Sequence, residues 1–199
     1  MSTRIAFLKG HGTENDFVIV PDADNAIELP PAAVAALCDR RAGIGGDGLL
    51  HVVRSAAHPD ARHLAAEAEW FMDYRNGDGS VAEMCGNGVR VFARYLERAG
   101  LVGEGDVAVA TRGGVKRVHI AKPTEDGAPG DITVAMGKAV LPGGDVTISV
   151  DEHQWPALNV NMGNPHAVAF VADLAHAGRL LDPPPFSPAT AYPHGVNVE

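Results

Sequence analysis

The sequence predicts an α+β fold with mixed or antiparallel sheets. The 199 residues include 23 Gly and 14 Pro, so most apolar segments between turns have only the length of strands. Few segments have helical periodicity, and strands and helices do not alternate as they do in βαβ folds. A chain of this length can bury one large core or two small ones.

The first part of the chain contains four segments with strand character. They cover residues 5–8, 17–20, 49–53 and 69–75, and a glycine loop separates the first two. A helix is expected over residues 31–41, because Val34, Leu37 and Cys38 follow helical spacing and Gly43 lies just beyond its end. This spacing places Cys38 in the core, whereas residues 57–66 have the composition of a loop.

The strongest helical pattern of the chain follows the turn Asn76-Gly77-Asp78-Gly79. It is a wide apolar stripe that ends at Gly100. So wide a stripe indicates a helix that is covered on several sides. The stripe consists of Val89, Phe92, Leu96 and Ala99, widened by Val91 and Tyr95.

The remainder of the chain is again rich in strands. These are expected over residues 107–110, 115–120, 132–135, 147–150, 158–160 and 167–172, followed by a short helix over 173–181. A glycine-containing loop at 127–130 divides the chain into an N-terminal lobe, 1–128, and a C-terminal lobe, 129–199. Because residues 195–199 have the pattern of the beginning of a strand, we expect this second lobe to be truncated.

Charge and composition exclude several classes of partner. The formal net charge is -9 and no basic tract is present, so nucleic acid is not an expected partner. No apolar run approaches the ~20 residues needed to span a bilayer, and residues 1–9 lack the apolar segment of a signal peptide. We therefore expect a cytoplasmic protein without a membrane partner. Cys38 and Cys85 form neither a disulfide framework nor a zinc pattern.

Cys85 stands where the strongest helix is expected to start, and Gly86-Asn87-Gly88 follow it. Amides in the first turn of a helix lack intrahelical partners and carry partial positive charge, which favours a thiolate there. Glycines leave these amides uncovered, so an anionic group can approach the main chain of Gly86 and Asn87. The segment therefore offers a thiolate base beside a cradle for a carboxylate. The alternative is a buried cysteine at a tight turn.

Three further motifs have a functional and a structural interpretation. Asn15 follows a glycine loop and is either a ligand contact or part of a flexible loop. Asn76 either faces a ligand or belongs to a simple hairpin turn. In Asn164-Pro165-His166, the proline stiffens a turn, and His166 either tunes a nearby thiol or is a core histidine. The glycines at 43–48 are not a nucleotide site, because they lack the P-loop Lys-Ser/Thr and follow a helix rather than a strand.

Taken in order, these blocks resemble the diaminopimelate epimerase family. The resemblance implies two similar lobes, each a sheet wrapped around a central helix, and catalysis without pyridoxal phosphate, metal or other cofactor. Two cysteines, one from each lobe, interconvert LL- and meso-diaminopimelate for lysine and peptidoglycan synthesis. The matching blocks are Asn15-Asp16-Phe17, residues 40–48, 76–80, 85–90 and 162–166, and Gly195-Val196-Asn197.

Roles follow from the resemblance, position by position. Cys85 is the thiol of the first lobe, and His166 is expected to tune the pKa of a catalytic thiol. The full-length protein is expected to be a homodimer, with diaminopimelate as its small-molecule substrate. The substrate contacts are Asn15, Asn76, Asn164 and Asn197, with main-chain donors from Gly86 and Asn87.

The sequence departs from the family pattern in three places. Gly48 stands where many members have Gln, and Glu14 precedes Asn15. The second catalytic cysteine of the family would lie beyond Glu199, and Cys38 cannot replace it. We therefore expect this chain not to epimerise by itself. The alternatives are a proline-racemase-like or phenazine-isomerase-like enzyme, a non-catalytic binding fragment and, least favoured, a thiol-dependent hydrolase.

Overall fold

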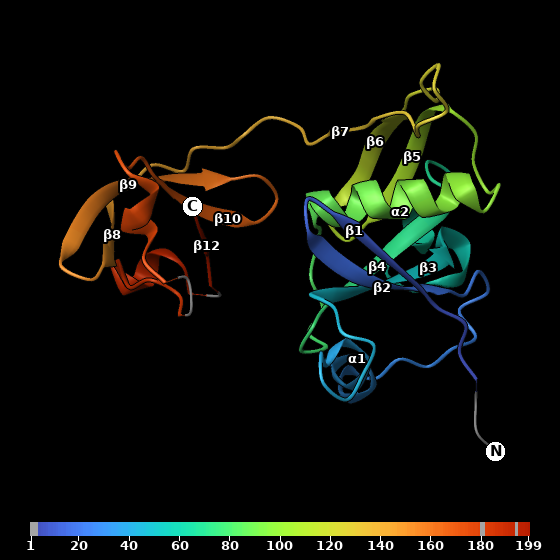
Figure 1. Ribbon diagram of the computed structural model, residues 1–199, viewed down its shortest axis with the longest axis horizontal. Coiled ribbons are helices and arrows are strands. Elements are labelled where there is room, and N and C mark those ends of the chain that lie inside the picture. Colours follow the sequence, from blue (N-terminus) through green and yellow to red (C-terminus); the bar gives the residue numbers. More distant parts are fainter. Residues whose placement is uncertain (1–3, 180–181, 194) are drawn as a thin grey trace. The chain divides into compact units, whose positions relative to one another are not determined.

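The chain folds into two compact units, Met1–Met136 and Gly137–Glu199, in a computed structural model that describes residues 4–179, 182–193 and 195–199 (Figure 1). The division lies later than the expected boundary at 128/129. The reason is that strand β7 (Ile132–Ala135) pairs with β6 (Gly114–Ile120) and so completes the first sheet. The loop at 127–130 therefore joins two strands of one sheet rather than two lobes.

The first unit contains a seven-stranded mixed sheet in which the strands follow their order in the chain. Its neighbours are antiparallel except at two places, β2/β3 and β4/β5, where the strands are parallel. Parallel neighbours need a crossover, which α1 (Pro31–Cys38) and α2 (Gly86–Arg98) provide. The other strands are β1 (Leu8–Gly12), β2 (Asn15–Pro21), β3 (Gly48–Arg54), β4 (Trp70–Asn76) and β5 (Gly105–Thr111).

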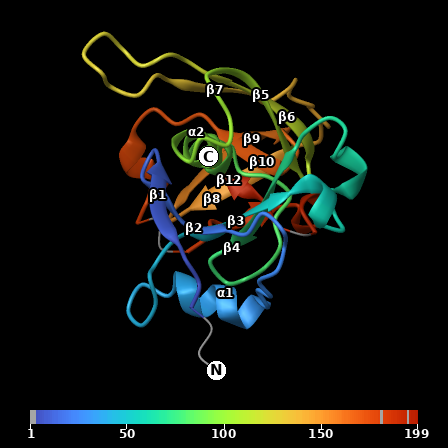
Figure 2. The ribbon, with the colours of Figure 1, turned by 90° about the vertical axis from the view of Figure 1, so that its right-hand side faces the viewer.

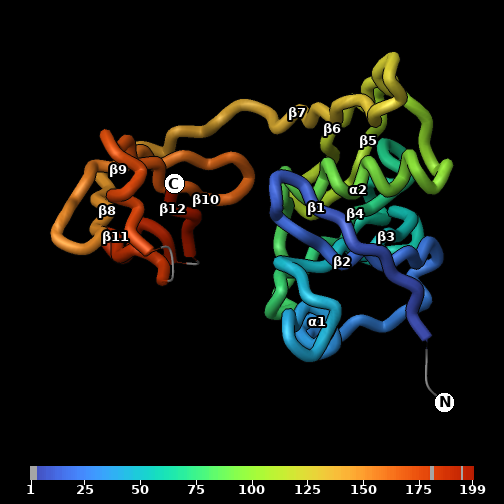
Figure 3. Tube along the Cα trace, viewed as in Figure 1, coloured from blue at the N-terminus to red at the C-terminus, as the bar shows by residue number. Residues whose placement is uncertain are grey.

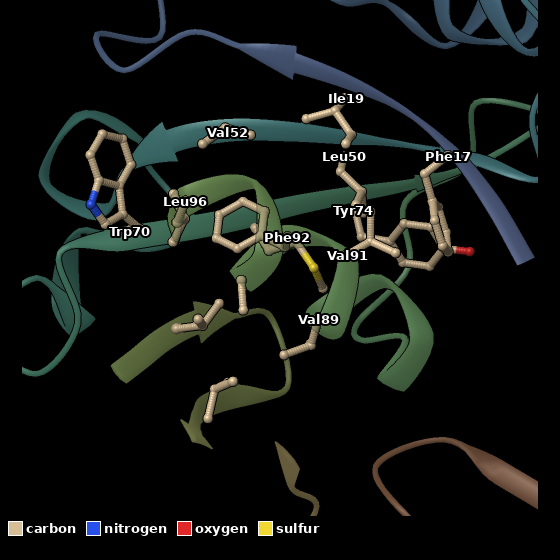
Figure 4. Close-up of a cluster of buried hydrophobic side chains, with 14 of the residues drawn as sticks. Phe17, Ile19, Leu50, Val52, Trp70, Tyr74, Val89, Val91, Phe92 and Leu96 are labelled. Atoms are coloured by element: carbon tan, nitrogen blue, oxygen red, sulfur yellow. The ribbon is translucent and has the colours of Figure 1, made fainter. Parts of the chain in front are cut away.

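The sheet curls around α2, which packs against both edge strands, β1 and β7, and against four strands between them (Figure 2). The predicted apolar stripe is confirmed at Val89, Phe92 and Leu96, which are fully buried, but not at Ala99, which is exposed just after the helix ends. Figure 4 shows these side chains in one cluster with apolar side chains of β2, β3 and β4. The α+β class and a sheet wrapped around a central helix are thus present in the first unit.

The outer face of this sheet is covered by α1, which lies on the path from β2 to β3 (Figure 3). Cys38 packs there with Val18, Val20, Val34 and Leu49, and is 5% exposed. Its predicted place in the core is confirmed, and burial raises the pKa of its thiol. The helix ends before the expected residue 41, because the side chain of Asp39 accepts the amides of residues 41 and 42 and turns the chain.

The glycine segment near the N-terminus is a strand rather than a loop. Gly10 and Gly12 belong to β1, which passes directly over α2. A Cβ on Gly10 would lie 3.0 Å from Cγ1 of Val91, and a Cβ on Gly12 would lie 3.1 Å from the carbonyl oxygen of Asn87. The glycines therefore permit close packing of strand on helix. The turn is Thr13-Glu14, with φ of 54° and 64°.

A buried group of charges lies on the outer face of β3 and β4. His51 is placed between two carboxylates, with Nε2 2.9 Å from Asp22 and Nδ1 3.3 Å from Asp73. Arg75 and Arg112 each approach Asp73 to 2.7 Å. Both ring nitrogens of His51 lie within hydrogen-bond distance of a carboxylate. The network joins residues that are far apart in sequence.

The segment expected as a loop at 57–66 contains short helical turns. These are η1 (Ser55–Ala57) and η2 (Arg62–Leu64). Ala61 and Ala68 are buried there against Phe71 and Ala110, which gives the outer face a small core of its own.

The second unit contains a five-stranded sheet in the order β11-β8-β9-β10-β12. β10 and β12 are parallel and the other pairs are antiparallel. The described residues of this unit contain no α-helix, and η3 (Leu174–Ala177) takes the place of the helix expected over 173–181, of which 180 and 181 lie outside the described residues. The strands are β8 (Val146–Val150), β9 (His153–Asn161), β10 (Pro165–Ala169), β11 (Phe186–Ser187) and β12 (Asn197–Val198), with η4 at Ala189–Ala191.

The core of the second unit gathers around Val146, Ile148, Ala157, Ala167 and Tyr192. The strand β11 was not expected, because Pro183-Pro184-Pro185 precede it and hide the short pattern. In the described part of the chain, no helix combines the length and the apolar character that crossing a membrane requires.

Candidate active site

Cys85 is the N-cap residue of α2, and its side chain is half-buried. Its φ of -141° is extended, and its Sγ accepts a hydrogen bond from the amide of Gly88 at 3.4 Å. Serine, threonine, aspartate and asparagine usually supply this interaction. A Cβ on Gly88 would lie 3.4 Å from Cβ of Cys85 and 3.3 Å from Cδ2 of Leu50, tighter than most such contacts, so the glycine eases the close approach of amide to sulfur.

The first turn of α2 also presents free main-chain donors. Among the described residues, the amides of Gly86 and Asn87 have no protein hydrogen-bond partner. Gly86 has no side chain to cover them, and the helix dipole adds partial positive charge at this end. An anionic group placed beside Cys85 would therefore find two donors ready.

Asn15, at the start of β2, is the side-chain amide that meets the thiol. The Sγ–H of Cys85 donates to Oδ1 of Asn15, 3.6 Å away, while Nδ2 of Asn15 donates to Asp47 at 2.8 Å. The structure thus brings together Asn15 and Cys85, which are 70 residues apart in sequence. It also places Asp47 beside Asn15. From the sequence, Asp47 was only one residue of a glycine-rich segment with no assigned role.

A group of ion pairs lies next to Asn15 and Asp47 and holds the chain around them in place. Asp16 is bound by Arg40 and by Lys9, each at 2.6 Å. The hydrogen bonds from Arg40 hold the pKa of Asp16 well below its usual range, against the opposing effect of burial, and Lys9 lowers it further. The same arginine reaches Asp47 at 2.7 Å. The arrangement fixes the ends of β2 and β3 beside the helix start.

Asn76 lies at the end of β4, in the turn that precedes Cys85. Its Oδ1 accepts from the hydroxyl of Tyr74 at 3.0 Å, and its Nδ2 donates to Ser80 at 3.0 Å. The amide predicted to face a ligand is thus engaged within its own turn. This turn is bound to the other glycine segment, since the amide of Gly77 donates to the carbonyl of Asp47.

We expect Gly79→Ala to destabilise the first unit by about 2–3 kcal/mol. Gly79 has a φ of +85°, and a Cβ there would lie 2.2 Å from the carbonyl oxygen of Pro31. Gly127→Ala is the matched control, because Gly127 has a φ of +82° with no atom near its missing Cβ. The control should cost only the roughly 1 kcal/mol of the left-handed backbone. Equal urea midpoints for the two variants would contradict the steric argument.

Asn87 uses its side chain to join α2 to the β1–β2 turn. Its Oδ1 accepts from Thr13 at 3.1 Å and from Arg90. Arg90 also donates to Thr13, and Arg94 donates to the carbonyl of Gly130. These contacts tie the helix to both edges of the curled sheet. The carbonyl oxygen of the Asn87 side chain is therefore engaged within the protein, and its main-chain amide faces no protein partner among the described residues.

The predicted residues of the second unit lie close to one another. Nε2 of His166 is 3.0 Å from Oδ1 of Asn164, and its Nδ1 is 2.8 Å from Glu199. Asn197 is opposite His166 in the β10/β12 pair, and its Nδ2 donates to the carbonyl of Pro165. Asn164, His166 and Asn197 thus lie together in the second unit, whereas in the first unit the direct contact is between Asn15 and Cys85.

A large groove lies in another part of the first unit. It encloses about 910 Å³ between β1, α2 and β7, and Cys85 is not among its lining residues. Arg90 and Arg94 line it, and Arg94 also donates to the carbonyl of Gly130, another lining residue. Within the described residues, no three His, Cys, Asp or Glu side chains are arranged to hold a metal ion.

Solved structures with the same fold include enzymes that act on proline derivatives. A hydroxyproline epimerase from Agrobacterium vitis superposes with a TM-score of 0.59 at 14% identity, covering 92% of this chain and 55% of that one. At this identity the similarity concerns the fold alone. It supports the α+β class expected from the sequence.

Sequence comparison is more specific. The model of the family described as diaminopimelate epimerase matches residues 7–142. A diaminopimelate epimerase of Streptomyces coelicolor is 79% identical over 199 residues, which are all of this chain and 67% of that protein. One from Thermobifida fusca is 50% identical over 97% of this chain and 69% of its own length. The chain therefore belongs to the diaminopimelate epimerase family.

Proposed function

We propose that the protein interconverts LL- and meso-diaminopimelate, an isomerase reaction of lysine and peptidoglycan precursor synthesis, with Cys85 as one of two catalytic thiols. The observation that carries the proposal is the position of Cys85 at the N-cap of α2. There, its sulfur meets the Gly88 amide, and the free amides of Gly86 and Asn87 lie in the same turn. Membership of the family supplies the substrate.

The reaction needs removal of a weakly acidic proton from the α-carbon. In the proposed mechanism the substrate α-carboxylate binds the amides of Gly86 and Asn87, where the helix dipole offsets the negative charge that develops on the carbanion. Sγ of Cys85 takes or gives the proton on one face of the α-carbon. The Gly88 amide stabilises the sulfur when it is a thiolate.

Inversion requires a second thiol on the opposite face. The other cysteine of this chain, Cys38, is 5% exposed and packed in the core beneath α1. It cannot take that role without unfolding its surroundings. With Cys85 alone, a proton removed from the α-carbon exchanges with solvent and returns to the same face.

The remaining site residues are proposed to bind the substrate or to tune a thiol, and they differ in how directly they contact Cys85. Asn15 touches Cys85 directly and is proposed to bind substrate beside it. Asn76 would reach the substrate only by sharing its amide with Tyr74 and Ser80. Asn164 and Asn197 are proposed as contacts to substrate from the second unit, and His166, held by Asn164, as the residue that tunes a thiol.

Three finer assignments rest on the family resemblance. They are catalysis without pyridoxal phosphate, a cytoplasmic site of action and a homodimer for the full-length protein. Light scattering of the full-length protein would test the last. The alternative of a proline-racemase-like enzyme is not favoured, because 79% identity to a diaminopimelate epimerase contrasts with 14% to the hydroxyproline epimerase.

The experiment is incubation of this chain with LL-diaminopimelate in D2O, followed by NMR of the α-proton. We expect deuterium to enter at the α-carbon without formation of the meso isomer. Cys85→Ala should abolish this exchange, whereas Cys38→Ala should retain it, because the buried thiol takes no part. Proline in place of diaminopimelate should show no exchange.

A second measurement covers the case in which exchange is slow. Iodoacetamide should modify Cys85 in the folded chain, and LL-diaminopimelate should slow that modification by occupying the site. Failure of both exchange and protection would show a non-catalytic fragment that does not bind this substrate. Exchange that persists in Cys85→Ala would contradict the assigned base.

A further inference from the structure

Asp47 determines which end of the Asn15 amide faces the catalytic sulfur. Nδ2 of Asn15 lies 2.8 Å from Oδ2 of Asp47, and Oδ1 lies 3.6 Å from Sγ of Cys85. An ionised carboxylate only accepts hydrogen bonds, so the amide must turn its NH2 group toward Asp47. The carbonyl oxygen of Asn15 is therefore left toward the thiol.

Asp47 is itself held in place by the ends of β2 and α1. The backbone amide of Asp16 donates to its Oδ2 at 3.0 Å, and Arg40 donates to its Oδ1 at 2.7 Å. Its own amide donates to the carbonyl of Asp16 at 2.8 Å. The main chain and both carboxylate oxygens of Asp47 are thus held by hydrogen bonds. Its Oδ2, which accepts from Asn15, is therefore fixed in one position.

The consequence for Cys85 depends on its protonation. A thiol donates its S–H to the Asn15 carbonyl, which is favourable, whereas a thiolate would face that oxygen with like partial charge. On its other side the sulfur meets the Gly88 amide, which favours the thiolate. The charged and titratable groups nearby are Tyr74 on β4, whose pKa is raised chiefly by burial, Asp47 itself, and the ion-paired Asp16, Arg40 and Lys9 beside it. Because its pKa is raised, Tyr74 remains in its neutral form over the pH range of the alkylation test described below.

We propose that Asp47 is a positioning residue which, by orienting the Asn15 amide, holds Cys85 in the protonated state before substrate binds. Its catalytic consequence, that this thiol must give up its proton before it can act as the base toward LL-diaminopimelate, relies on the proposed function. The protonation state itself does not, and is measured without substrate. Asp47 touches neither the thiol nor any group proposed to bind the α-carboxylate.

The test is the rate of Cys85 alkylation by iodoacetamide between pH 5.5 and 9.5, followed by mass spectrometry. In Asp47→Ala the Asn15 amide is free to rotate and donate Nδ2 to the sulfur. We expect alkylation at pH 7 to become about threefold to tenfold faster, with the midpoint of the pH profile moving to lower pH. Cys38 in the same sample is the internal control for folding, since it is buried and should stay unmodified.

Two further variants separate orientation from charge. Asp47→Asn removes the charge but keeps a carbonyl oxygen for Nδ2 of Asn15, so its profile should stay within about twofold of the parent. Asn15→Ala should accelerate alkylation like Asp47→Ala, and adding Asp47→Ala to it should change nothing more.

The proposal would be overturned by any of three results. An unchanged profile in Asp47→Ala would remove the link between carboxylate and thiol. A shift in Asp47→Asn as large as that in Asp47→Ala would show that charge acts directly. A full effect of Asp47→Ala in the Asn15→Ala background would show that the amide is not the intermediary. None of these outcomes depends on whether diaminopimelate is the substrate.

Discussion

Replacing Asp73 with alanine is expected to destabilise the first unit by about 3–5 kcal/mol. The side chain is 1% exposed, and its carboxylate lies against His51, Arg75 and Arg112. Its removal leaves His51, Arg75 and Arg112 without the carboxylate that they share. His51 still contacts Asp22 and Arg112 still contacts Asp60, but Arg75 is left without a carboxylate partner among the described residues, and such a defect is costly in a buried network.

The effect should depend on pH in a defined direction. Burial alone would raise the pKa of Asp73, but hydrogen bonds from His51 and Arg75 and the charge of Arg112 outweigh it and hold the pKa well below its usual range. A carboxyl with a depressed folded pKa contributes its full stability above the unfolded pKa of about 3.9. That contribution is lost as the pH falls through the folded pKa, so the parent and Asp73→Ala should approach each other only under strongly acidic conditions.

Urea unfolding measures this difference. Trp70 is buried in the first unit and Trp155 lies in the second, so a Trp155→Phe background makes the fluorescence report the first unit alone. Asp24→Ala is the matched control, since Asp24 is 87% exposed at its side chain and, in the part of the chain that the structure describes, pairs only with exposed Arg54. This control should cost less than about 1 kcal/mol. A similarly small loss of unfolding free energy in Asp73→Ala would mean that the buried network does not stabilise the fold.

Phe92→Ala is expected to cost about 3–5 kcal/mol. Phe92 is fully buried at the centre of the α2 stripe, in the cluster shown in Figure 4. The strands that surround α2 are hydrogen-bonded into one curled sheet, which limits how far the resulting cavity can collapse. Because α2 also presents Cys85, the variant should lose the selective alkylation of that thiol at lower urea concentrations than the parent.

The control for this substitution is Phe7→Ala, which removes the same side chain where it is 49% exposed. It should cost less than about 1.5 kcal/mol, because water already reaches half of the ring. Parallel urea titrations, with Cys85 and Cys38 alkylation read together by mass spectrometry, show whether the helix start and the core are lost in one step. Equal losses of unfolding free energy in Phe92→Ala and Phe7→Ala would contradict the argument that burial of Phe92 stabilises the core.

Local periodicity and turn chemistry were sufficient for much of the first unit. The apolar stripe at Val89, Phe92 and Leu96 predicted α2, and its breadth predicted a helix covered on several sides. The pattern around Cys85 predicted a cysteine at the start of this helix. These features depend on neighbouring residues and on backbone sterics, which short segments of sequence record directly. The place of Cys38 in the core followed from the same kind of spacing.

Contacts between distant segments had no such local signal. Gly10 and Gly12 look like a loop in sequence, and only the passage of β1 over α2 explains them as packing residues. The boundary after Met136 depends on strand pairing that no local pattern predicts. The hydrogen bonds around His51, and those that link Asp47, Asn15 and Cys85, join segments that lie tens of residues apart in the sequence. The sequence by itself determined the central helix, its cysteine and the family. The tertiary structure decided which carboxylate orients Asn15, because a hydrogen bond across 32 residues depends on strand register and sheet curvature that no local pattern encodes.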